Sequence, residues 1–170
     1  MTPGSLPARL AALDARATAA TNAASRRNPA TRRVVAVLAE RLAAVEVGLM
    51  GLLLVGGRPR SVARMLLAVG LVYGASEALG RLWPRERPFE RCAAIEALVE
   101  HTSGRSFPSR HVASGLAMAA IGQQAHPSVG RLMTLVAALL ATMRVAAGLH
   151  YPSDVVAGAI LGIVVGRLLR

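Results

Sequence analysis

The chain has 170 residues, enough for one domain but not comfortably for two. Hydrophobic residues make up 54% of it and charged residues only 17%, a composition too apolar for an ordinary soluble domain. The formal net charge is +11, and every one of the 20 basic residues is an arginine. Because these arginines interrupt apolar runs instead of forming a solvated stripe with interleaved aromatic residues, the sequence favours a protein embedded in the membrane bilayer and argues against a nucleic-acid partner.

Residues 1–33 form a polar, alanine-rich and basic N-terminal segment that precedes the first apolar run. Leu6, Leu10, Leu13 and Ala17 recur at helical spacing, so part of the segment is compatible with an amphipathic helix on the membrane surface. A disordered basic tail accounts equally well for the same composition. The sequence leaves both alternatives open.

Residues 34–170 form the second unit, a transmembrane domain. Its apolar runs provide about five spans at roughly 20 residues per crossing. In the first run the charged residues Glu40, Arg41 and Glu46 come early, which predicts that the later half is the part buried in lipid. The predicted fold class is therefore all-α, a polytopic membrane helix bundle of about five transmembrane helices, with spans over residues 34–57, 62–82, 108–124, 132–149 and 153–169.

Two features of the spans carry further expectations. Glu77 interrupts the second span, and we expect a carboxylate inside a membrane to face the interior of the bundle, with Arg81 four residues later as its ion-pair partner. Gly158, Gly162 and Gly166 recur every four residues in the last span, a stripe of small residues that allows close helix packing.

An odd number of spans puts the two termini on opposite sides of the membrane and the three polar clusters of the domain on the N-terminal side. The arginines of the N-terminal segment favour the cytoplasm for that side. We therefore expect an integral protein of the plasma (inner) membrane whose functional site faces the cytoplasm. The sequence does not define its oligomeric state.

The most informative cluster lies between the last two spans and contains Arg144, His150 and Asp154. A charged group at membrane depth costs on the order of 2.5–3.5 kcal/mol, so three polar residues of this kind together indicate chemistry on an anion. We expect Arg144 to bind the anion. Asp154, four residues after His150, would accept a hydrogen bond from one ring N–H and leave the other nitrogen to attack phosphorus.

Two further clusters supply what such a site still needs. Arg85 and Arg87 carry planar guanidinium groups that match the oxygens of a phosphate. Ser109, Arg110 and His111 stand at the start of a predicted helix, where free N–H groups favour an anion, and His111 is the candidate general acid. No cluster has the spacing of metal ligands, so we expect no metal and no other cofactor, with arginine in their place.

Three motifs in these clusters resemble the signatures of the type 2 phosphatidic acid phosphatase (PAP2) superfamily. The resemblance implies a metal-independent phosphoric monoester hydrolase that acts on a lipid phosphate substrate in the membrane. It also implies that His150 forms a phosphohistidine, that Asp154 supports it, that His111 protonates the leaving group, and that the matching arginines and serine hold phosphate. The motifs are Arg85-x-Arg87-Pro88, Pro108-Ser109-Arg110-His111 and Arg144-x5-His150-x3-Asp154, in the family's order.

Departures from the family pattern motivate an alternative. Gly80 stands where the first motif has Lys, and Arg81, one residue later, is the candidate replacement as a phosphate ligand. Arg110 stands in place of a Gly, and Met143 in place of a Ser. A non-catalytic membrane protein that binds a lipid or a partner is the alternative to an enzyme.

The short, alanine- and arginine-rich chain is similar to actinobacterial members of the family that act on polyprenyl-linked sugar phosphates. The resemblance therefore favours a substrate such as decaprenylphosphoryl-5-phosphoribose, used in cell-wall biosynthesis. Phosphatidic acid, phosphatidylglycerophosphate and undecaprenyl pyrophosphate are the alternative substrates.

Overall fold

In the computed structural model, which describes residues 6–100 and 103–170, the described residues form helices and loops and no strands. The prediction of an all-α fold is therefore confirmed. The first five residues of the N-terminal segment lie outside the described residues. The described helices are α1 (Leu6–Ser25), α2 (Pro29–Val55), α3 (Pro59–Leu82), α4 (Pro88–Arg91), α5 (Arg110–Ala125), α6 (Pro127–Ala146) and α7 (Pro152–Leu169).

Proline marks the start of most of these helices. A proline at the first helical position has a suitable fixed φ and lacks an N–H that would have no partner inside the helix. Pro29 also follows Asn28, whose side chain accepts a hydrogen bond from the Thr31 N–H at 2.8 Å and so caps α2. The helices that begin with proline are α2, α3, α4, α6 and α7.

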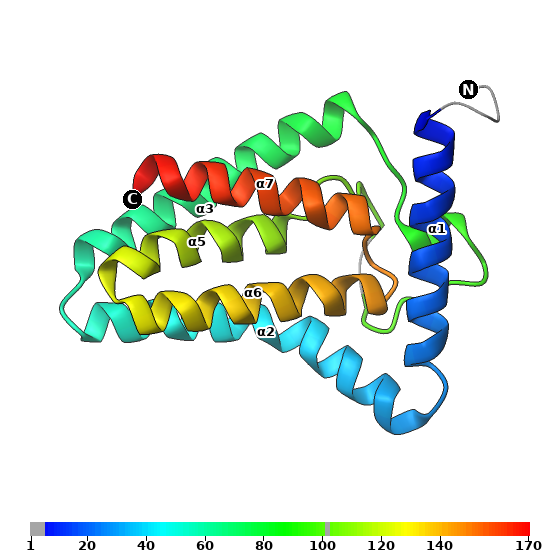
Figure 1. Ribbon diagram of the computed structural model, residues 1–170, viewed down its shortest axis with the longest axis horizontal. Coiled ribbons are helices and arrows are strands. Elements are labelled where there is room, and N and C mark those ends of the chain that lie inside the picture. The colour runs from blue at the N-terminus through cyan, green and yellow to red at the C-terminus, as the bar shows by residue number, and fades with distance from the viewer. Residues whose placement is uncertain (1–5, 101–102) are drawn as a thin grey trace.

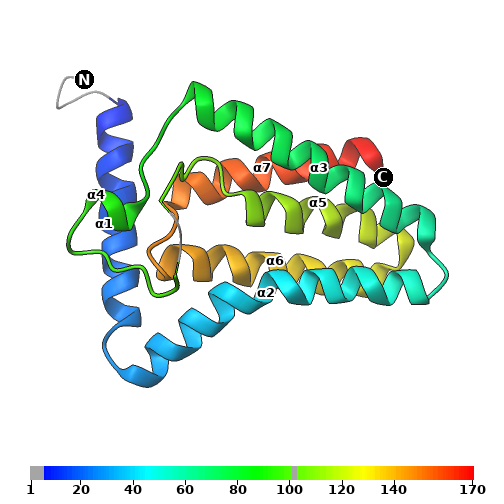
Figure 2. The same cartoon turned by 180° about the vertical axis from the view of Figure 1, so that it is seen from behind.

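In the described part of the chain, the long helices α2, α3, α5, α6 and α7 lie side by side along the long axis of the molecule, and α1 crosses one end of them (Figures 1 and 2). Helix α5 lies at the centre, packed against α2, α3, α6 and α7. The fully buried core side chains Met65, Val72, Ile121 and Met133 come from α3, α5 and α6. The C-terminus lies at the end of the bundle opposite α1, as the predicted topology requires (Figure 1).

The outer faces of the long helices are apolar, as expected for surfaces in contact with lipid. Among the described residues, three helices are long and apolar enough to cross a membrane, namely α3, α6 and α7. The other two predicted spans, α5 and α2, are not among these three helices. Helix α5 has only 16 residues, and α2 carries several charged residues. Large apolar side chains that remain exposed include Leu52, Leu67, Leu71, Leu135, Val156, Ile160 and Val164.

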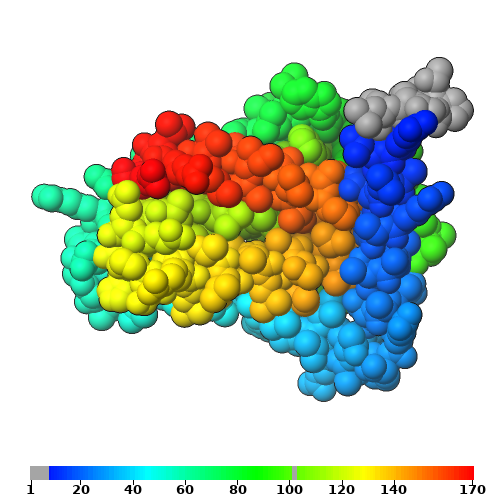
Figure 3. Space-filling view, viewed as in Figure 1, coloured from blue at the N-terminus to red at the C-terminus, as the bar shows by residue number. Residues whose placement is uncertain are grey.

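Of the two alternatives for the N-terminal segment, the helix is correct over residues 6–25. Helix α1 lies against the ends of α6 and α7 (Figure 3). The fully buried Asn22 side chain anchors it, donating to the carbonyls of Glu96 and Ala146 at 2.9 and 3.0 Å and accepting from the Glu96 N–H at 3.0 Å. The segment is therefore part of the fold.

Glu77 and Glu46 differ from expectation in opposite ways, since Glu77 is exposed and Glu46 is buried. The Glu77 side chain is 40% exposed and pairs with Arg81 at 3.1 Å, so the ion pair is confirmed but the inward orientation is wrong. Glu46, expected outside the lipid-buried half of its span, is 1% exposed and points into the bundle. The charge pattern of α2 could not reveal this, because it does not show which face of the helix meets α5.

Candidate active site

The glycine stripe of α7 brings the starts of α5 and α7 together. A Cβ atom at Gly158 would lie 2.5 Å from the Ser109 carbonyl oxygen, and one at Gly162 would lie 2.2 Å from the Ala113 carbonyl oxygen. Only glycine allows α7 to approach the backbone of α5 this closely, which confirms the predicted close packing. The Ser109 N–H also donates to the Asp154 carbonyl at 3.0 Å, so the second and third motifs are in direct contact.

The turn from α6 to α7 fixes the place of His150. Gly148 has a φ of +75°, and a Cβ atom there would lie 2.7 Å from the Glu96 carbonyl oxygen, so the turn requires glycine. The N–H groups of Leu149 and His150 then donate back to the Arg144 carbonyl at 3.1 and 3.3 Å. His150 is thereby held beside Arg144 at the end of the bundle.

The His150 ring is oriented by a backbone carbonyl. Nδ1 lies 2.9 Å from the Ser106 carbonyl oxygen, which can only accept, so Nδ1 carries the proton and Nε2 carries the lone pair. Burial of the 3%-exposed ring lowers the pKa of His150 to about 4, against the opposing effect of the Asp154 carboxylate. The imidazole is therefore neutral at physiological pH, with Nε2 available as a nucleophile or base.

The Asp154 carboxylate supports this ring at a longer distance than predicted. Its Oδ2 lies 3.8 Å from His150 Nδ1, an ion-pair distance, because the Ser106 carbonyl takes the expected hydrogen bond. Oδ2 instead accepts from the Tyr151 N–H at 2.9 Å, and Oδ1 accepts from Arg85 at 2.7 Å. The carboxylate is fully buried and fixed behind the ring.

Arg85 belongs to a network behind the site. One guanidinium nitrogen donates to Asp154 and to the Ser153 hydroxyl, each at 2.7 Å, and the other donates to Asp14 of α1 at 2.7 Å. Asp14 also accepts from the Ser153 N–H at 3.1 Å and from the Ser153 hydroxyl. Arg85 therefore ties α1 to the start of α7, and its guanidinium is occupied by carboxylates.

A basic hollow of about 120 Å³ opens in front of His150. Arg87 lies beside His150 in this hollow, with Nη1 3.5 Å from Nε2 and 3.0 Å from the Leu149 carbonyl that orients it. Both imidazoles and four guanidinium groups therefore border the same space. The hollow is lined by Tyr73, Arg87, Arg105, Pro108, Arg110, His111, Arg144 and His150.

Five of the nine predicted site residues line this hollow: Arg87, Arg110, His111, Arg144 and His150. Asp154 and Arg85 lie behind it, as described above.

Two predicted phosphate ligands are not among the residues that line the hollow. Ser109 is fully buried at the start of α5, and its Oγ has no hydrogen-bond partner among the described residues. Arg81 is 71% exposed and pairs with Glu77.

Three residues of this region were missed from the sequence: Tyr73, Arg105 and Asp14. Arg105 lines the hollow from the loop before α5, and its side chain passes over Gly80, where a Cβ atom would lie 3.4 Å from Arg105 Cδ and Nε. Arg105 thus occupies space beside the position that carries Lys in the family pattern. The lysine-to-glycine change could have prompted a search for a replacement elsewhere, but no spacing rule links residues 80 and 105.

A curated relative is similar to part of the chain. The bacitracin transport permease protein BcrC of Bacillus licheniformis is 30% identical over 103 residues, which are 58% of this chain. The match spans 51% of the relative, about half of its length.

Two solved structures share the fold. The crystal structure of Aquifex aeolicus LpxE has a TM-score of 0.78 and 25% sequence identity, covering 92% of this chain and 94% of that one. The first transmembrane PAP2 type phosphatidylglycerolphosphate phosphatase from Bacillus subtilis has a TM-score of 0.74 and 22% identity, covering 98% and 86%. The family model of the PAP2 superfamily matches residues 61–170, which include all three motifs and more than half of the sequence. The chain belongs to the PAP2 superfamily.

Proposed function

We propose that the chain is a membrane lipid phosphatase that hydrolyses a phosphomonoester through a phosphohistidine at His150. The observation that carries the proposal is the hollow itself, in which four arginines and two histidines from four separate segments surround a space of phosphoryl size. Phosphoryl transfer needs positive charge around the three equatorial oxygens as charge spreads in the transition state. The guanidinium groups supply it without a metal ion.

In the first step, His150 Nε2 attacks phosphorus while the bond from phosphorus to the lipid oxygen breaks. The electron pair of that bond leaves with the lipid oxygen, and His111 gives the oxygen a proton, so the lipid alcohol is released. The phosphoryl group is then bonded to Nε2, and the ring carries a positive charge. The Asp154 carboxylate, 3.8 Å from Nδ1, is placed to stabilise that charge.

In the second step, water attacks the phosphohistidine. His111, now neutral, accepts a proton from the water as the new phosphorus–oxygen bond forms. The phosphorus–nitrogen bond breaks, its electron pair returns to Nε2, and inorganic phosphate leaves. The starting protonation state of both histidines is restored.

Arg105 takes the role that we first assigned to Arg81. Its position in the hollow, beside Gly80, supports a phosphate contact in place of the missing Lys. Arg85 then acts as a positioning residue for Asp154, because its guanidinium already binds Asp154 and Asp14.

The favoured substrate is a polyprenyl-linked sugar phosphate such as decaprenylphosphoryl-5-phosphoribose. The alternatives are phosphatidic acid, phosphatidylglycerophosphate and undecaprenyl pyrophosphate. The enzyme would reside in the plasma membrane with its site at the cytoplasmic face. The packing of the basic helix α1 against the ends of α6 and α7 supports this orientation, since it puts the N-terminal arginines at the same end as the site.

The test is phosphate release by the full chain in detergent micelles, with EDTA present, from a panel of these lipids. We expect turnover of at least one lipid, inhibition by vanadate, and loss of turnover in His150→Asn, a variant that keeps a polar group of similar size. A requirement for Mg²⁺ together with indifference to vanadate would contradict the histidine mechanism. Hydrolysis of phosphatidic acid but not of the polyprenyl sugar phosphate would reverse the order of substrates.

A further inference from the structure

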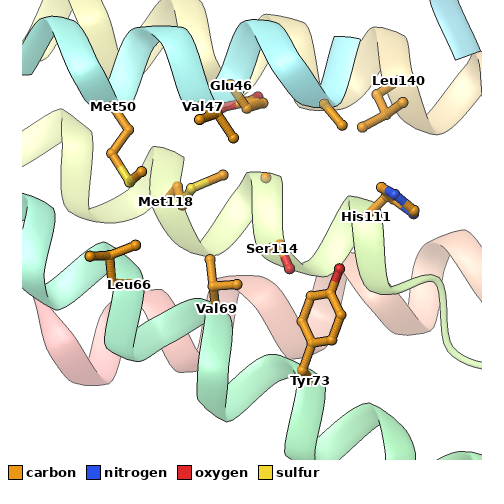
Figure 4. Close-up of a pocket in the computed structure, with 12 residues that line it drawn as sticks. Glu46, Val47, Met50, Leu66, Val69, Tyr73, His111, Ser114, Met118 and Leu140 are labelled. Atoms are coloured by element: carbon orange, nitrogen blue, oxygen red, sulfur yellow. The ribbon is translucent and has the colours of Figure 1, made fainter. Parts of the chain in front are cut away.

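A second cavity lies inside the helix bundle, deeper than the basic hollow. It has a volume of about 240 Å³ and lies between α2, α3, α5 and α6 (Figure 4). Most of its walls are hydrocarbon or thioether, as expected for a space that holds an apolar chain. Its apolar lining includes Ala43, Val47, Met50, Leu66, Val69, Met118 and Leu140.

This cavity continues from the hollow. Tyr73 and His111 line both spaces, so the candidate general acid stands at their junction. From His111 the cavity follows one face of α5 past Ser114 to Met118, a distance of about 10 Å at 1.5 Å per residue. A lipid with its phosphate in the hollow would therefore have the atoms next to the phosphate opposite Ser114.

Two buried polar groups interrupt the apolar wall at that depth. Glu46 is 1% exposed, and neither of its carboxyl oxygens has a hydrogen-bond partner among the described residues. The Ser114 hydroxyl is likewise buried and without a partner in the described part of the chain. Glu46 packs opposite Gly115, where a Cβ atom would lie 3.5 Å from Oε1, and Figure 4 shows the Tyr73 hydroxyl on the far side, pointing toward α5.

Such groups are costly in an apolar interior unless something binds them. A buried polar group without a hydrogen-bond partner lowers the stability of the fold, and a carboxyl group inside a membrane protein is a functional feature by default. Ser114, Tyr73 and His111 are the other residues of the cavity lining with a polar side chain. The remaining lining residues have no side chain that could hydrogen-bond to Glu46. The missing partner is therefore expected to come from a ligand.

We propose that Glu46 and Ser114 form a subsite that binds hydroxyl groups on the linker between the phosphate and the hydrocarbon chain of the lipid substrate. The linker would be a glycerol with a free hydroxyl or a sugar, since both carry a hydroxyl close to the phosphate. The hydrocarbon chain passes below them along Met50, Leu66 and Met118. It leaves the bundle where Val47 and Leu66, each more than half exposed, form the rim of the cavity.

This inference rests on the proposed function, and its test compares substrates within that function. Three lipids are hydrolysed in parallel: a long-chain alkyl phosphate without hydroxyls, a 1-acylglycerol 3-phosphate with one hydroxyl, and a polyprenyl-linked pentose 5-phosphate with sugar hydroxyls. The quantity measured is the ratio of kcat/KM for each hydroxylated lipid to kcat/KM for the alkyl phosphate. Glu46→Leu is expected to lower this ratio about tenfold, as loss of a buried hydrogen bond does, whereas Glu46→Gln retains most of it.

The matched control is Glu40→Leu, the same change at an exposed position of α2, which is expected to leave the ratio unchanged. The hydroxylated lipid whose kcat/KM ratio is lowered in Glu46→Leu, either the glycerol lipid or the sugar lipid, identifies the linker. Melting temperature is a second readout. Replacing a carboxyl group without partners by an apolar side chain should raise the melting temperature, so loss of the ratio cannot then be ascribed to unfolding.

Two results would overturn the inference alone. One is a wild-type ratio retained in Glu46→Leu while phosphate release persists. The other is a lowered ratio accompanied by a lowered melting temperature, which would assign Glu46 to the fold. If no lipid of the panel is hydrolysed by the wild-type chain, the proposed function fails first and the subsite fails with it.

Discussion

The His150 ring has one nitrogen bound to the Ser106 carbonyl and the other directed at Arg87 in the hollow. This arrangement separates two tasks that the sequence assigned to Asp154 alone. A neutral carbonyl fixes the tautomer, and in the proposed mechanism the buried carboxylate at 3.8 Å would stabilise the charge that appears after phosphoryl transfer. The ring can therefore stay neutral before the reaction and become cationic during it.

The pH behaviour of His150 tests this description. Its pKa of about 4 lies below the ordinary value of 6.5, so the ring is expected to remain neutral as the pH falls from 7 to 5. Unfolding frees the ring to bind a proton below pH 6.5, so the fold should lose stability as the pH falls from 6.5 towards 4. Histidine-selective NMR of the four histidines, assigned with His150→Asn, measures the midpoint. A midpoint at or above 6.5 would contradict the burial argument.

Arg105 and Arg81 provide a comparison within one ion-pair cluster. Both bind Glu77, but only Arg105 lines the hollow. Arg105→Ala should lower kcat/KM about 10- to 100-fold, because a charge-assisted hydrogen bond to phosphate is worth about 1.5–3 kcal/mol. Arg81→Ala should change it less than about twofold, since an exposed ion pair contributes little. Equal losses in the two variants would mean that Glu77, and not phosphate, is the partner that matters.

At the scale of whole helices, the site depends on the contact between α5 and α7. The glycines of α7 rest against carbonyl oxygens of α5, and this contact brings the second and third motifs together. Helix α1 closes the end of the bundle through Asn22 and Asp14. A substitution in the middle of α7 that separates it from α5 should therefore also move the residues of the site and reduce turnover.

Gly162→Ala tests the effect of the α5–α7 contact on the site with a residue that does not line the hollow. The added Cβ would lie 2.2 Å from the Ala113 carbonyl oxygen, so the helices must separate, and we expect destabilisation by about 1–3 kcal/mol with reduced turnover. Gly70→Ala in α3 is the control, because nothing lies within 4 Å of its Cβ and alanine favours a helix by up to about 1 kcal/mol. Thermal unfolding in detergent measures both variants. Equal free energies of unfolding for the two variants would contradict the prediction, because they would show that α5 and α7 can separate without loss of stability.

The sequence predicted the motifs of the site better than its surroundings. Arg87, His111, Arg144 and His150 line the hollow, and each was predicted to belong to the site because it stands in a short motif with a chemical reason for its spacing. Arg105 and Asp14 reach the region through a loop and a separate helix, and no local periodicity links them to it. The burial of Glu46 depends on which face of α2 meets α5, which only the packed bundle reveals.

At the scale of the whole molecule, the orientation in the membrane decides which pool of lipid the site can reach. The site, α1 and the start of α2 share one end of the bundle, and the C-terminus lies at the other (Figure 1). The molecule therefore has two possible orientations in the membrane, and a label on a residue at either end of the bundle distinguishes them.

Cys92, the single cysteine, follows α4 at the site's end and is partly exposed. With the site in the cytoplasm, a membrane-impermeant maleimide should label Cys92 only after cells are permeabilised. In the Cys92→Ser background, Arg58→Cys places a cysteine in the turn between α2 and α3 at the opposite end, and it should be labelled in intact cells. The reverse pattern would put the site outside.

The most direct test of the account is to trap the phosphorylated enzyme. The full chain is mixed with a hydrolysable lipid phosphate carrying a radioactive phosphoryl group, quenched within one turnover, and the labelled peptide is identified. We predict an acid-labile, base-stable phosphoryl group on the peptide that contains His150, absent in His150→Asn. Turnover with no labelled protein, or label on any other residue, would contradict the mechanism.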